Sequence, residues 1–393
     1  MKKEVREGYK MTELGEIPED WKIRKLKDIA NICYGKSQKE VEMPNGKYKI
    51  LGTGGIIGYT NDFLWDKPSV LIGRKGTINK PQYIEEPFWT VDTLFYTKIN
   101  KEYVAKWFYY YLNNINLKKY NEATGVPSLS ASNLNSIKII VPTYEEQEKI
   151  VSILSTVDEQ IDNVDALIEK NKELKKGLMQ TLLTKGIGHT KFKKTEIGEI
   201  PEEWKLKTFK DISKVSQGLQ IAIDERYKEF KAGRLPYITI QYLNDKLNPD
   251  NEYFIENFSQ NVVCKEDDIL MTRTGNTGIV VTNEVGVFHN NFFKVDFRRD
   301  LFNKDFLVFF LNAKFIQSLI IRYAGTTTIP DLKHSDFYKL PIVIPLLEEQ
   351  EKIASILSEV DKKIEGYENK KKKLEELKKG LMQQLLTGKM RVV

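Results

Sequence analysis

Residues 143–184 read TYEEQEKIVSILSTVDEQIDNVDALIEKNKELKKGLMQTLLT, and residues 346–387 repeat this stretch at a constant offset of 203 positions. Each copy follows a proline, Pro142 or Pro345, and then continues for about forty residues without another. Proline at the start and none inside is typical of one long helix. At about 1.5 Å per residue, each helix would be roughly 60 Å long.

Apolar residues in each copy alternate at spacings of four and three, which is typical of a helix that packs against another helix. Towards the end of each copy the repeat changes phase and continues through Leu174 or Leu377. Such a helix must bury its apolar stripe, so we expect an antiparallel coiled-coil pair rather than two unrelated surface helices. The residues predicted to pair are Ile150, Leu154, Val157 and Ile161 in the first copy and Ile353, Leu357, Val360 and Ile364 in the second.

A second repeat precedes each helix, because residues 9–35 match residues 192–218 at an offset of 183. The chain is therefore two copies of one unit, and the second variable domain is 20 residues longer. We expect one domain at 1–142, a helix at 143–185, a second domain at 186–345 with a connector at 186–191, and a helix with its tail at 346–393. Each unit would consist of an N-terminal segment, a variable domain and a long helix.

The variable domains share a faint pattern of strands, turns and one aromatic helix. SVLIGRKGTINK from Ser69 and DILMTRTGNTGIV from Asp268 both read as a strand that runs into a glycine turn. We call Arg74–Gly76 and Arg273–Gly275 the RxG turns. The aromatic stretch WFYYYLN from Trp107 is predicted to be a core helix rather than a platform for stacking bases. The fold class expected for each domain is α+β, with a curved sheet.

Composition excludes several classes of protein. The chain is 41% hydrophobic and 30% charged, its N-terminus lacks an apolar signal region, and no stretch approaches about 18 apolar residues. Cys33 and Cys264 have no CxxC partner, so we expect a reduced, cytoplasmic protein without structural zinc and without a membrane. Residues 21–142 hold 18 Lys and Arg against 10 Asp and Glu, whereas residues 204–345 hold 19 against 17. A bias of +8 in one domain suggests a polyanionic partner.

Motifs for catalysis are missing. No [DN]PP[YF] segment marks an amino-methyltransferase, no clustered carboxylates with [DE]xK mark a nuclease, and neither GxGxxG nor GxxxxGK[ST] is present. His189, His289 and His334 are scattered without metal-ligand spacing. The sequence therefore favours a binding protein without a cofactor over an enzyme.

Positive signals for DNA binding centre on the RxG turns, because Arg can bond two acceptors of guanine, Gln or Asn can do so on adenine, and Lys neutralises phosphate. For most of these residues, a solvated side chain that merely flanks a hairpin is an equally good interpretation, but Arg74 and Arg273 favour a DNA contact because the arginine recurs in both domains. The basic runs at the helix ends are more typical of solvated helix faces. The candidate DNA contacts are Lys36, Lys49, Arg74, Lys75, Thr77 and Lys80 in the first domain and Gln220, Arg234, Gln241, Arg273, Thr274, Asn276 and Thr277 in the second.

Taken in order, these parts resemble the specificity subunit of Type I restriction-modification systems over essentially the whole chain. The resemblance rests on GEIPEDWKIRKLKDIANI and GEIPEEWKLKTFKDISKV, on TGVPSLSASNLNSIKIIVP, and on the duplicated EEQEKIVSIL/EEQEKIASIL and KGLMQTLLT/KGLMQQLLT. It implies two target recognition domains, each reading one half of a split double-stranded DNA site, with the helices setting the gap.

The resemblance also implies that methylation, S-adenosylmethionine, ATP and Mg²⁺ belong to partner subunits. Two modification subunits would dock on the helices and on the repeated N-terminal segments, with restriction subunits bound through them, so Trp21, Trp204 and the exposed helix faces become candidate partner contacts. The alternative is a free-standing DNA-binding regulator with internal pseudo-symmetry. A regulator should bind a discrete site tightly by itself, whereas a specificity subunit should need its methyltransferase partner.

Overall fold

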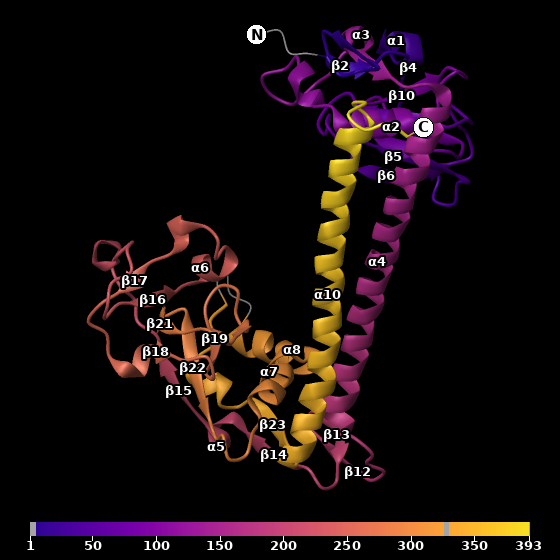
Figure 1. Cartoon of the computed structure of the whole chain (residues 1–393). Helices are drawn as coiled ribbons and strands as arrows, with labels where there is room; N and C mark the ends of the chain where they lie inside the picture. The colour runs from indigo at the N-terminus through magenta and orange to yellow at the C-terminus, as the bar shows by residue number, and fades with distance from the viewer. Residues whose placement is uncertain (1–4, 326–329, 393) are drawn as a thin grey trace. The chain divides into compact units, whose positions relative to one another are not determined.

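The computed structural model describes residues 5–325 and 330–392 and divides the chain into two compact units (Figure 1). Unit 1 comprises residues 1–166 and 368–393, and unit 2 comprises residues 167–367. Each unit contains one globular part and one half of each long helix. The domain bounds predicted from the sequence follow the repeat and assign a whole helix to each domain. They stay a prediction, because the two compact units are defined by contacts and each takes half of both helices.

The globular part of unit 1 is built on a four-stranded antiparallel sheet in the order β4-β10-β7-β8 and a three-stranded sheet in the order β6-β5-β9. Its central strand β7 is buried along its whole length, as expected for the apolar run SVLIG. The elements of the globular part are β1 (Tyr9–Thr12), β2 (Gly15–Pro18), β3 (Lys22–Lys25), α1 (Leu26–Ile29), β4 (Ala30–Tyr34), β5 (Tyr48–Gly52), β6 (Gly55–Thr60), β7 (Ser69–Gly73), β8 (Gln82–Ile84), β9 (Phe88–Thr90), β10 (Leu94–Ile99), α2 (Ala105–Asn114), η1 (Leu117–Tyr120), α3 (Ala131–Ser136) and β11 (Lys138–Val141).

The globular part of unit 2 repeats the same design, with a four-stranded sheet in the order β15-β22-β19-β20 and a second sheet in the order β17-β16-β21-β18. Most of the extra residues lie between β15 and β19. The elements are β12 (Phe192–Thr195), β13 (Gly198–Pro201), β14 (Lys205–Thr208), α5 (Phe209–Ile212), β15 (Ser213–Gln217), η2 (Ile223–Glu225), β16 (Leu235–Ile238), α6 (Ile240–Asn244), η3 (Pro249–Asn251), β17 (Phe254–Ile255), η4 (Gln260–Val262), β18 (Val263–Cys264), β19 (Ile269–Thr272), β20 (Val280–Val281), β21 (Gly286–Phe288), β22 (Phe292–Phe297), α7 (Lys304–Asn312), α8 (Lys314–Ala324), α9 (His334–Phe337) and β23 (Pro341–Ile344).

The matching strand orders confirm the internal repeat and the α+β class. In both units the second sheet contains one parallel pair, β5 with β9 and β16 with β21. The strands predicted before both RxG turns and the aromatic helices α2 and α7 are present. Trp107 of α2 is fully buried, which confirms that its aromatic stretch belongs to the core.

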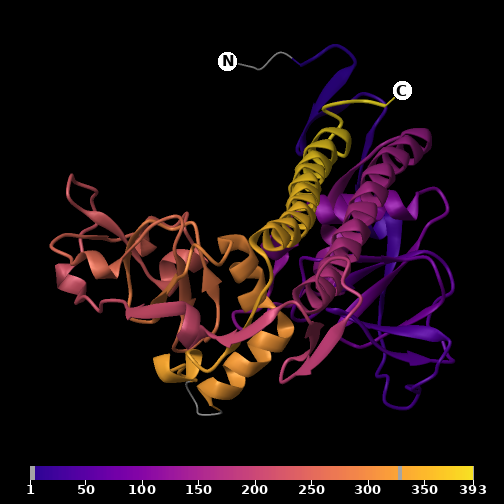
Figure 2. The ribbon, with the colours of Figure 1, turned by 90° about the horizontal axis from the view of Figure 1, so that it is seen from below.

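The long helices are α4 (Tyr144–Lys185) and α10 (Leu347–Leu385), and they lie side by side (Figures 1 and 2). In unit 1, Lys378 lies 2.5 Å from Asp158 and Lys371 lies 2.7 Å from Asp165. Seven residues forward along α4 thus correspond to seven residues backward along α10. This register makes the pair antiparallel, as predicted from the apolar repeat.

In unit 2, Lys175 lies 2.6 Å from Asp361, and this pair obeys the same register. The packing residues differ from prediction at one place, because Leu174 and Leu377 are 51% and 50% exposed. The neighbouring lysines Lys175 and Lys378 take the inward position instead, where their aliphatic stems cover apolar surface and their ammonium groups reach aspartates. The apolar stripe therefore resumes only after these lysines.

The residues predicted to pair the helices are buried or half-buried, but they have two kinds of neighbour. Ile150 and Leu154 belong to the core of unit 1, together with Met382 and Leu385 from the end of α10. Ile353 and its neighbours occupy the corresponding place in the core of unit 2. The start of each long helix therefore joins its own globular part to the end of the other helix.

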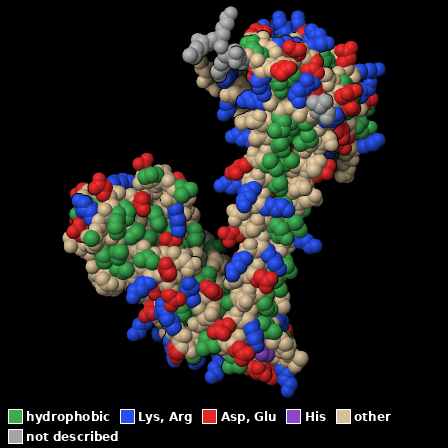
Figure 3. Space-filling view, in the orientation of Figure 1, with side chains coloured by type: hydrophobic (Ala, Val, Ile, Leu, Met, Phe, Trp, Pro, Cys, Tyr) green, Lys and Arg blue, Asp and Glu red, His purple; other side chains and the backbone are tan. Residues whose placement is uncertain are grey.

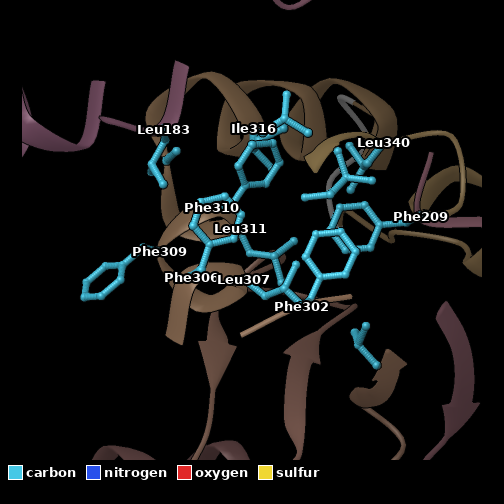
Figure 4. Packing of buried hydrophobic residues seen from close by; sticks show 14 of the residues in the cluster. Leu183, Phe209, Phe302, Phe306, Leu307, Phe309, Phe310, Leu311, Ile316 and Leu340 are labelled. Carbon is cyan, nitrogen blue, oxygen red and sulfur yellow. The ribbon is translucent and has the colours of Figure 1, made fainter. Parts of the chain in front are cut away.

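The core of unit 2 is rich in phenylalanine (Figure 4). Phe306 and Phe310 of α7 stack with ring centroids 6.1 Å apart, and Phe209 of α5 lies in the same cluster. Leu183, from the end of α4, is fully buried in this cluster. Loss of a buried leucine side chain such as that of Leu183 costs about 2–5 kcal/mol, so this residue helps to hold α4 to the globular part of unit 2.

Among the described residues, no single helix combines the length and apolarity needed to cross a membrane. The consecutive helices α7 and α8 meet these criteria only when taken together, and they are bent by 65°.

Candidate nucleic-acid interface

In unit 1, three chain segments meet at one edge of the main sheet. The antiparallel register pairs Phe95 of β10 with Tyr34, the last residue of β4, and Leu94 with Gly73, the last residue of β7. The residues that follow β4 and β7 therefore lie on either side of the start of β10. We call this edge, with the RxG turn that leaves it, the RxG edge.

The RxG turn is fastened to the segment that precedes α3. Gly76 donates its backbone N–H to the carbonyl oxygen of Pro127 at 2.9 Å, and Leu129 donates to the carbonyl oxygen of Arg74 at 2.9 Å. Gly76 has φ +86°, a conformation that glycine adopts without strain. The turn is thus a rigid platform for the side chains around it.

Unit 2 builds the same platform, because Gly275 has φ +83° and donates to Pro330 at 3.2 Å, while Leu332 donates to Arg273 at 2.9 Å. The recurrence in the sequence of the RxG turn and of the Pro-x-Leu segment, residues 127–129 and 330–332, therefore has a structural cause. It is not by itself a sign of DNA contact.

Around the turn of unit 1, basic and aromatic groups are exposed together. The guanidinium carbon of Arg74 lies 5.3 Å from the centroid of the Tyr34 ring, and Tyr34 is 54% exposed. Arg74 donates from Nη1 to the carbonyl oxygen of Asp92 at 3.0 Å. Lys36 and Lys75 are exposed on the same edge. This combination of cations and a planar ring suits a nucleic acid, which offers phosphates and base edges.

At the equivalent place in unit 2, the arginine is held by its own chain. Arg273 donates from Nε and Nη2 to the two carboxylate oxygens of Asp331 at 2.8 and 3.0 Å, and from Nη1 to Gln217 at 2.9 Å. Thr274 adds a fourth hydrogen bond, to Asp331 at 3.1 Å. The hydrogen bonds from Arg273 hold the pKa of Asp331 below its usual range, so this carboxylate stays charged.

The other predicted contacts divide between the RxG edge and places away from it. Thr77 and Lys80 follow the turn of unit 1 and are exposed, and Asn276 is exposed in the turn of unit 2. Thr277 lies in that turn too, but it donates its hydroxyl to Arg273 and Pro330 carbonyl oxygens, which stabilises the turn. Gln220 lies just beyond β15 and accepts a hydrogen bond from Asn290.

Three predicted contacts lie in or beside the second sheets rather than on the RxG edges. Lys49 is in β5 and forms a 2.5 Å ion pair with Glu86. Arg234 pairs with Glu256 at 3.1 Å and lies over the Tyr227 ring. Gln241 is exposed in the short helix α6. The structure thus does not gather all predicted contacts on one surface.

Sequence reasoning overlooked the residues that distinguish the two edges, namely Tyr34, Ser128, Gln217 and Asp331. A signal was present, since TGVPSL in the first half matches TTIPDL in the second and places Ser128 opposite Asp331. The bridges Lys75 to Ser128 and Thr274 to Asp331 confirm this equivalence.

The tryptophans predicted to contact partner subunits are buried, and that expectation is corrected. Trp21 is 0% and Trp204 2% exposed. Trp21 donates from Nε1 to Glu146 at 2.7 Å, and Trp204 donates to Glu349 at 3.0 Å. A buried indole needs an acceptor, and the glutamate in the first turn of the long helix supplies it. These residues fasten each helix to its globular part.

The next residue of the EEQ motif has a similar role. Gln147 donates to the carbonyl oxygen of Pro142 at 3.1 Å and accepts from the N–H of Val104 at 2.9 Å. Gln350 donates to Pro345 at 2.9 Å and accepts from Asn303 at 3.0 Å. The duplicated motif therefore builds the junction between helix and domain.

Among the described residues, no group of three or more His, Cys, Asp or Glu is placed to hold a metal ion. The three histidines also have separate surroundings, since His189 bonds to Glu349 at 2.9 Å, His289 accepts from Asn291, and His334 packs on Phe293.

Comparison with known proteins gives consistent results. A family model described as "Type I restriction modification DNA specificity domain" matches residues 18–175 and 201–376. The chain is 31% identical to the Type I restriction enzyme MjaIX specificity subunit of Methanocaldococcus jannaschii, over 98% of this chain and 96% of that protein. It is 27% identical to the MjaVIII specificity subunit of the same organism, over 98% and 96%.

A crystal structure of the Type-I restriction-modification system S subunit from M. genitalium has the same fold, with a TM-score of 0.61 and 18% identity over 93% of this chain and 96% of that one. A chain from a structural study of the assembly and conformational transition of the type I R-M system matches with a TM-score of 0.58 and 14% identity, over 95% and 99%.

Proposed function

This chain belongs to the family of Type I restriction modification DNA specificity domains, and from that premise we propose that it reads a bipartite, asymmetric DNA site without catalysing a reaction. Each globular part reads one half-site. Methyl transfer, ATP hydrolysis and cleavage, with S-adenosylmethionine and Mg²⁺, belong to modification and restriction subunits.

One observation carries this proposal: the four-stranded sheets that bear the RxG turns have the same strand order in both units, but the side chains on the two RxG edges differ. Because the backbone frames match, both globular parts can lie against a DNA duplex in the same way. The side chains presented to the duplex differ, since unit 1 offers Arg74 beside Tyr34 and unit 2 offers Arg273 paired with Asp331. Unlike surfaces read unlike bases, so the site is not a palindrome.

The antiparallel helices are proposed to set the unread gap between half-sites, about one helical turn or roughly 10 bp from centre to centre. Deleting residues 165–171 together with residues 365–371 removes segments that face each other in the observed register. The deletion spares Lys378 with Asp158 and Lys175 with Asp361. The half-sites should remain and the gap should shorten.

The test is methylome sequencing after expression with the modification subunit of the same system. A bipartite motif for the natural chain, and the same half-sites with a shorter gap for the deletion variant, supports the proposal. A continuous palindromic motif, or an unchanged gap, refutes it. Tight and specific DNA binding by the chain alone, with no methylation in the presence of the modification subunit, favours the alternative of a free-standing regulator.

Two modification subunits are proposed to dock on the helices. Leu174 of unit 2 and Leu377 of unit 1 occupy equivalent positions of the two long helices and are both exposed, and hydrophobic side chains are visible along the helix surface (Figure 3). Leu174→Glu with Leu377→Glu should prevent co-purification of the modification subunit. Leu247→Glu is the matched control, because Leu247 is 95% exposed in a loop of unit 2. Equal co-purification of both variants would exclude this surface.

A further inference from the structure

We propose that Arg74 reads a guanine, and that Asp331 closes the equivalent reading position of unit 2 by occupying Arg273 as a guanine would. This inference rests on the proposed function and names a residue that determines specificity within it. The residue opposite the arginine is Ser128 in unit 1 and Asp331 in unit 2. This residue decides whether the Nε–Nη2 edge of the arginine is available to a base.

The two guanidinium groups differ in which of their donors are bonded within the chain. In Arg273, the edge formed by Nε and Nη2 meets both oxygens of Asp331, and Nη1 meets Gln217. In Arg74, Nη1 is likewise bonded within the chain, to the carbonyl oxygen of Asp92. Within the part of the chain that the structure describes, no carboxylate pairs with Arg74 and no acceptor is bonded to its Nε–Nη2 edge. The same edge is therefore closed in unit 2 and open in unit 1.

The open Nε–Nη2 edge of Arg74 suits a pair of acceptors. Two parallel N–H groups match two acceptors side by side, as in a carboxylate or in the O6 and N7 atoms of guanine. Asp331 shows that the geometry of this turn supports such a two-point contact. Ser128 has one short hydroxyl and no charge, so it leaves the edge to an external acceptor pair.

The surroundings of Arg74 suit a base rather than a phosphate. The backbone of Arg74 is fixed by hydrogen bonds to Thr93 and Leu129, and its guanidinium lies over the Tyr34 ring. A planar group held at a fixed position suits a planar base edge, because sequence reading requires a defined register. Lys36 and Lys75, which are exposed on long flexible stems beside it, are suited to the phosphates.

The equivalence of Ser128 and Asp331 permits a swap. Ser128→Asp should create in unit 1 the arginine–aspartate pair that closes the reading position of unit 2. The two positions are equivalent, because Lys75 and Ser128 form the same β-bridge as Thr274 and Asp331. Asp331→Ser should open the reading position of unit 2. Arg24→Ala is the control, because Arg24 is exposed on β3, away from the RxG edge.

The experiment uses the complex with the modification subunit and duplexes that carry 7-deazaguanine, which lacks N7, at each guanine of the methylated motif in turn. At one guanine position, replacement by 7-deazaguanine should weaken DNA binding by the natural complex about tenfold or more. Arg74→Lys and Ser128→Asp should each bind the normal duplex more weakly and lose this response, whereas Arg24→Ala retains it. If the Ser128→Asp variant does not fold, the Arg74→Lys variant still tests the proposal.

The inference is overturned if 7-deazaguanine affects binding at no position, or if the Arg74→Lys complex responds to it like the natural complex. It is also overturned if the variants only reduce the salt dependence of binding, and do so equally on all duplexes, because that result indicates a phosphate contact. A bipartite methylation motif together with any of these results leaves the proposed function standing. Absence of such a motif in the natural complex is instead a failure of the proposed function.

Discussion

The C-terminal tail is predicted to stabilise unit 1 through one arginine. Arg391 donates from Nε to Glu146 at 2.9 Å and from Nη2 to Asp20 at 2.7 Å. Glu146 is only 4% exposed and also accepts the N–H of Trp21. Arg391→Ala would leave a buried carboxylate without its cation.

The expected cost follows from the geometry. Removal of one partner from a fully buried ion pair costs about 3–5 kcal/mol. The Arg391 side chain is 29% exposed, so water can partly replace it, and Trp21 still donates to the carboxylate. We therefore expect a loss of about 2 kcal/mol. For a unit of this size this corresponds to a fall of about 4–8 °C in melting temperature.

Differential scanning calorimetry of the whole chain measures this effect. Lys389→Ala is the control, because its side chain is exposed and the substitution retains its backbone carbonyl, which accepts a hydrogen bond from Arg6. That variant should remain within about 0.5 kcal/mol of the natural chain. A double-mutant cycle with Glu146→Gln should show coupling between positions 146 and 391. Arg391→Ala melting like the control would refute the reasoning.

Three further predictions follow from differences between the units and from buried polar groups. Tyr110→Phe should destabilise unit 1 by about 1–2 kcal/mol in chemical denaturation, because the Tyr110 hydroxyl donates to Asp158 of α4 at 2.6 Å; equal stability of Tyr110→Phe and the natural chain would contradict it. Lys36→Ala with Lys75→Ala should reduce the slope of log affinity against log salt by about 0.9 per lost contact, measured by titration of the complex with DNA, and an unchanged slope would place the phosphates elsewhere. Burial lowers the pKa of His289, so its contribution to stability is complete above pH 6.5 and is lost as the pH falls; His289→Gln should flatten the decrease between pH 6.5 and 5 in urea unfolding, and a parallel decrease would exclude this histidine as its cause.

The repeat, the helix pair and the α+β class could be predicted from the sequence because they depend on local and periodic signals. Pro142 and Pro345 mark helix starts, and a stripe at spacings of four and three identifies a face that must be covered. The exposed Leu174 was mispredicted, since only the antiparallel register shows that Lys175 and Asp361 take the inward place.

The roles of individual polar residues depended on partners far away in the chain. Trp21 and Glu146 are 125 positions apart, so composition alone could not tell a buried indole with an acceptor from an exposed partner contact. Arg74 and Arg273 look alike as RxG turns, and it is the hydrogen bonds of Arg273 to Asp331, 58 positions later, that separate them. A sequence determines which donors and acceptors exist and which faces are apolar, whereas tertiary structure decides which donors are already satisfied within the chain and which remain open to a ligand.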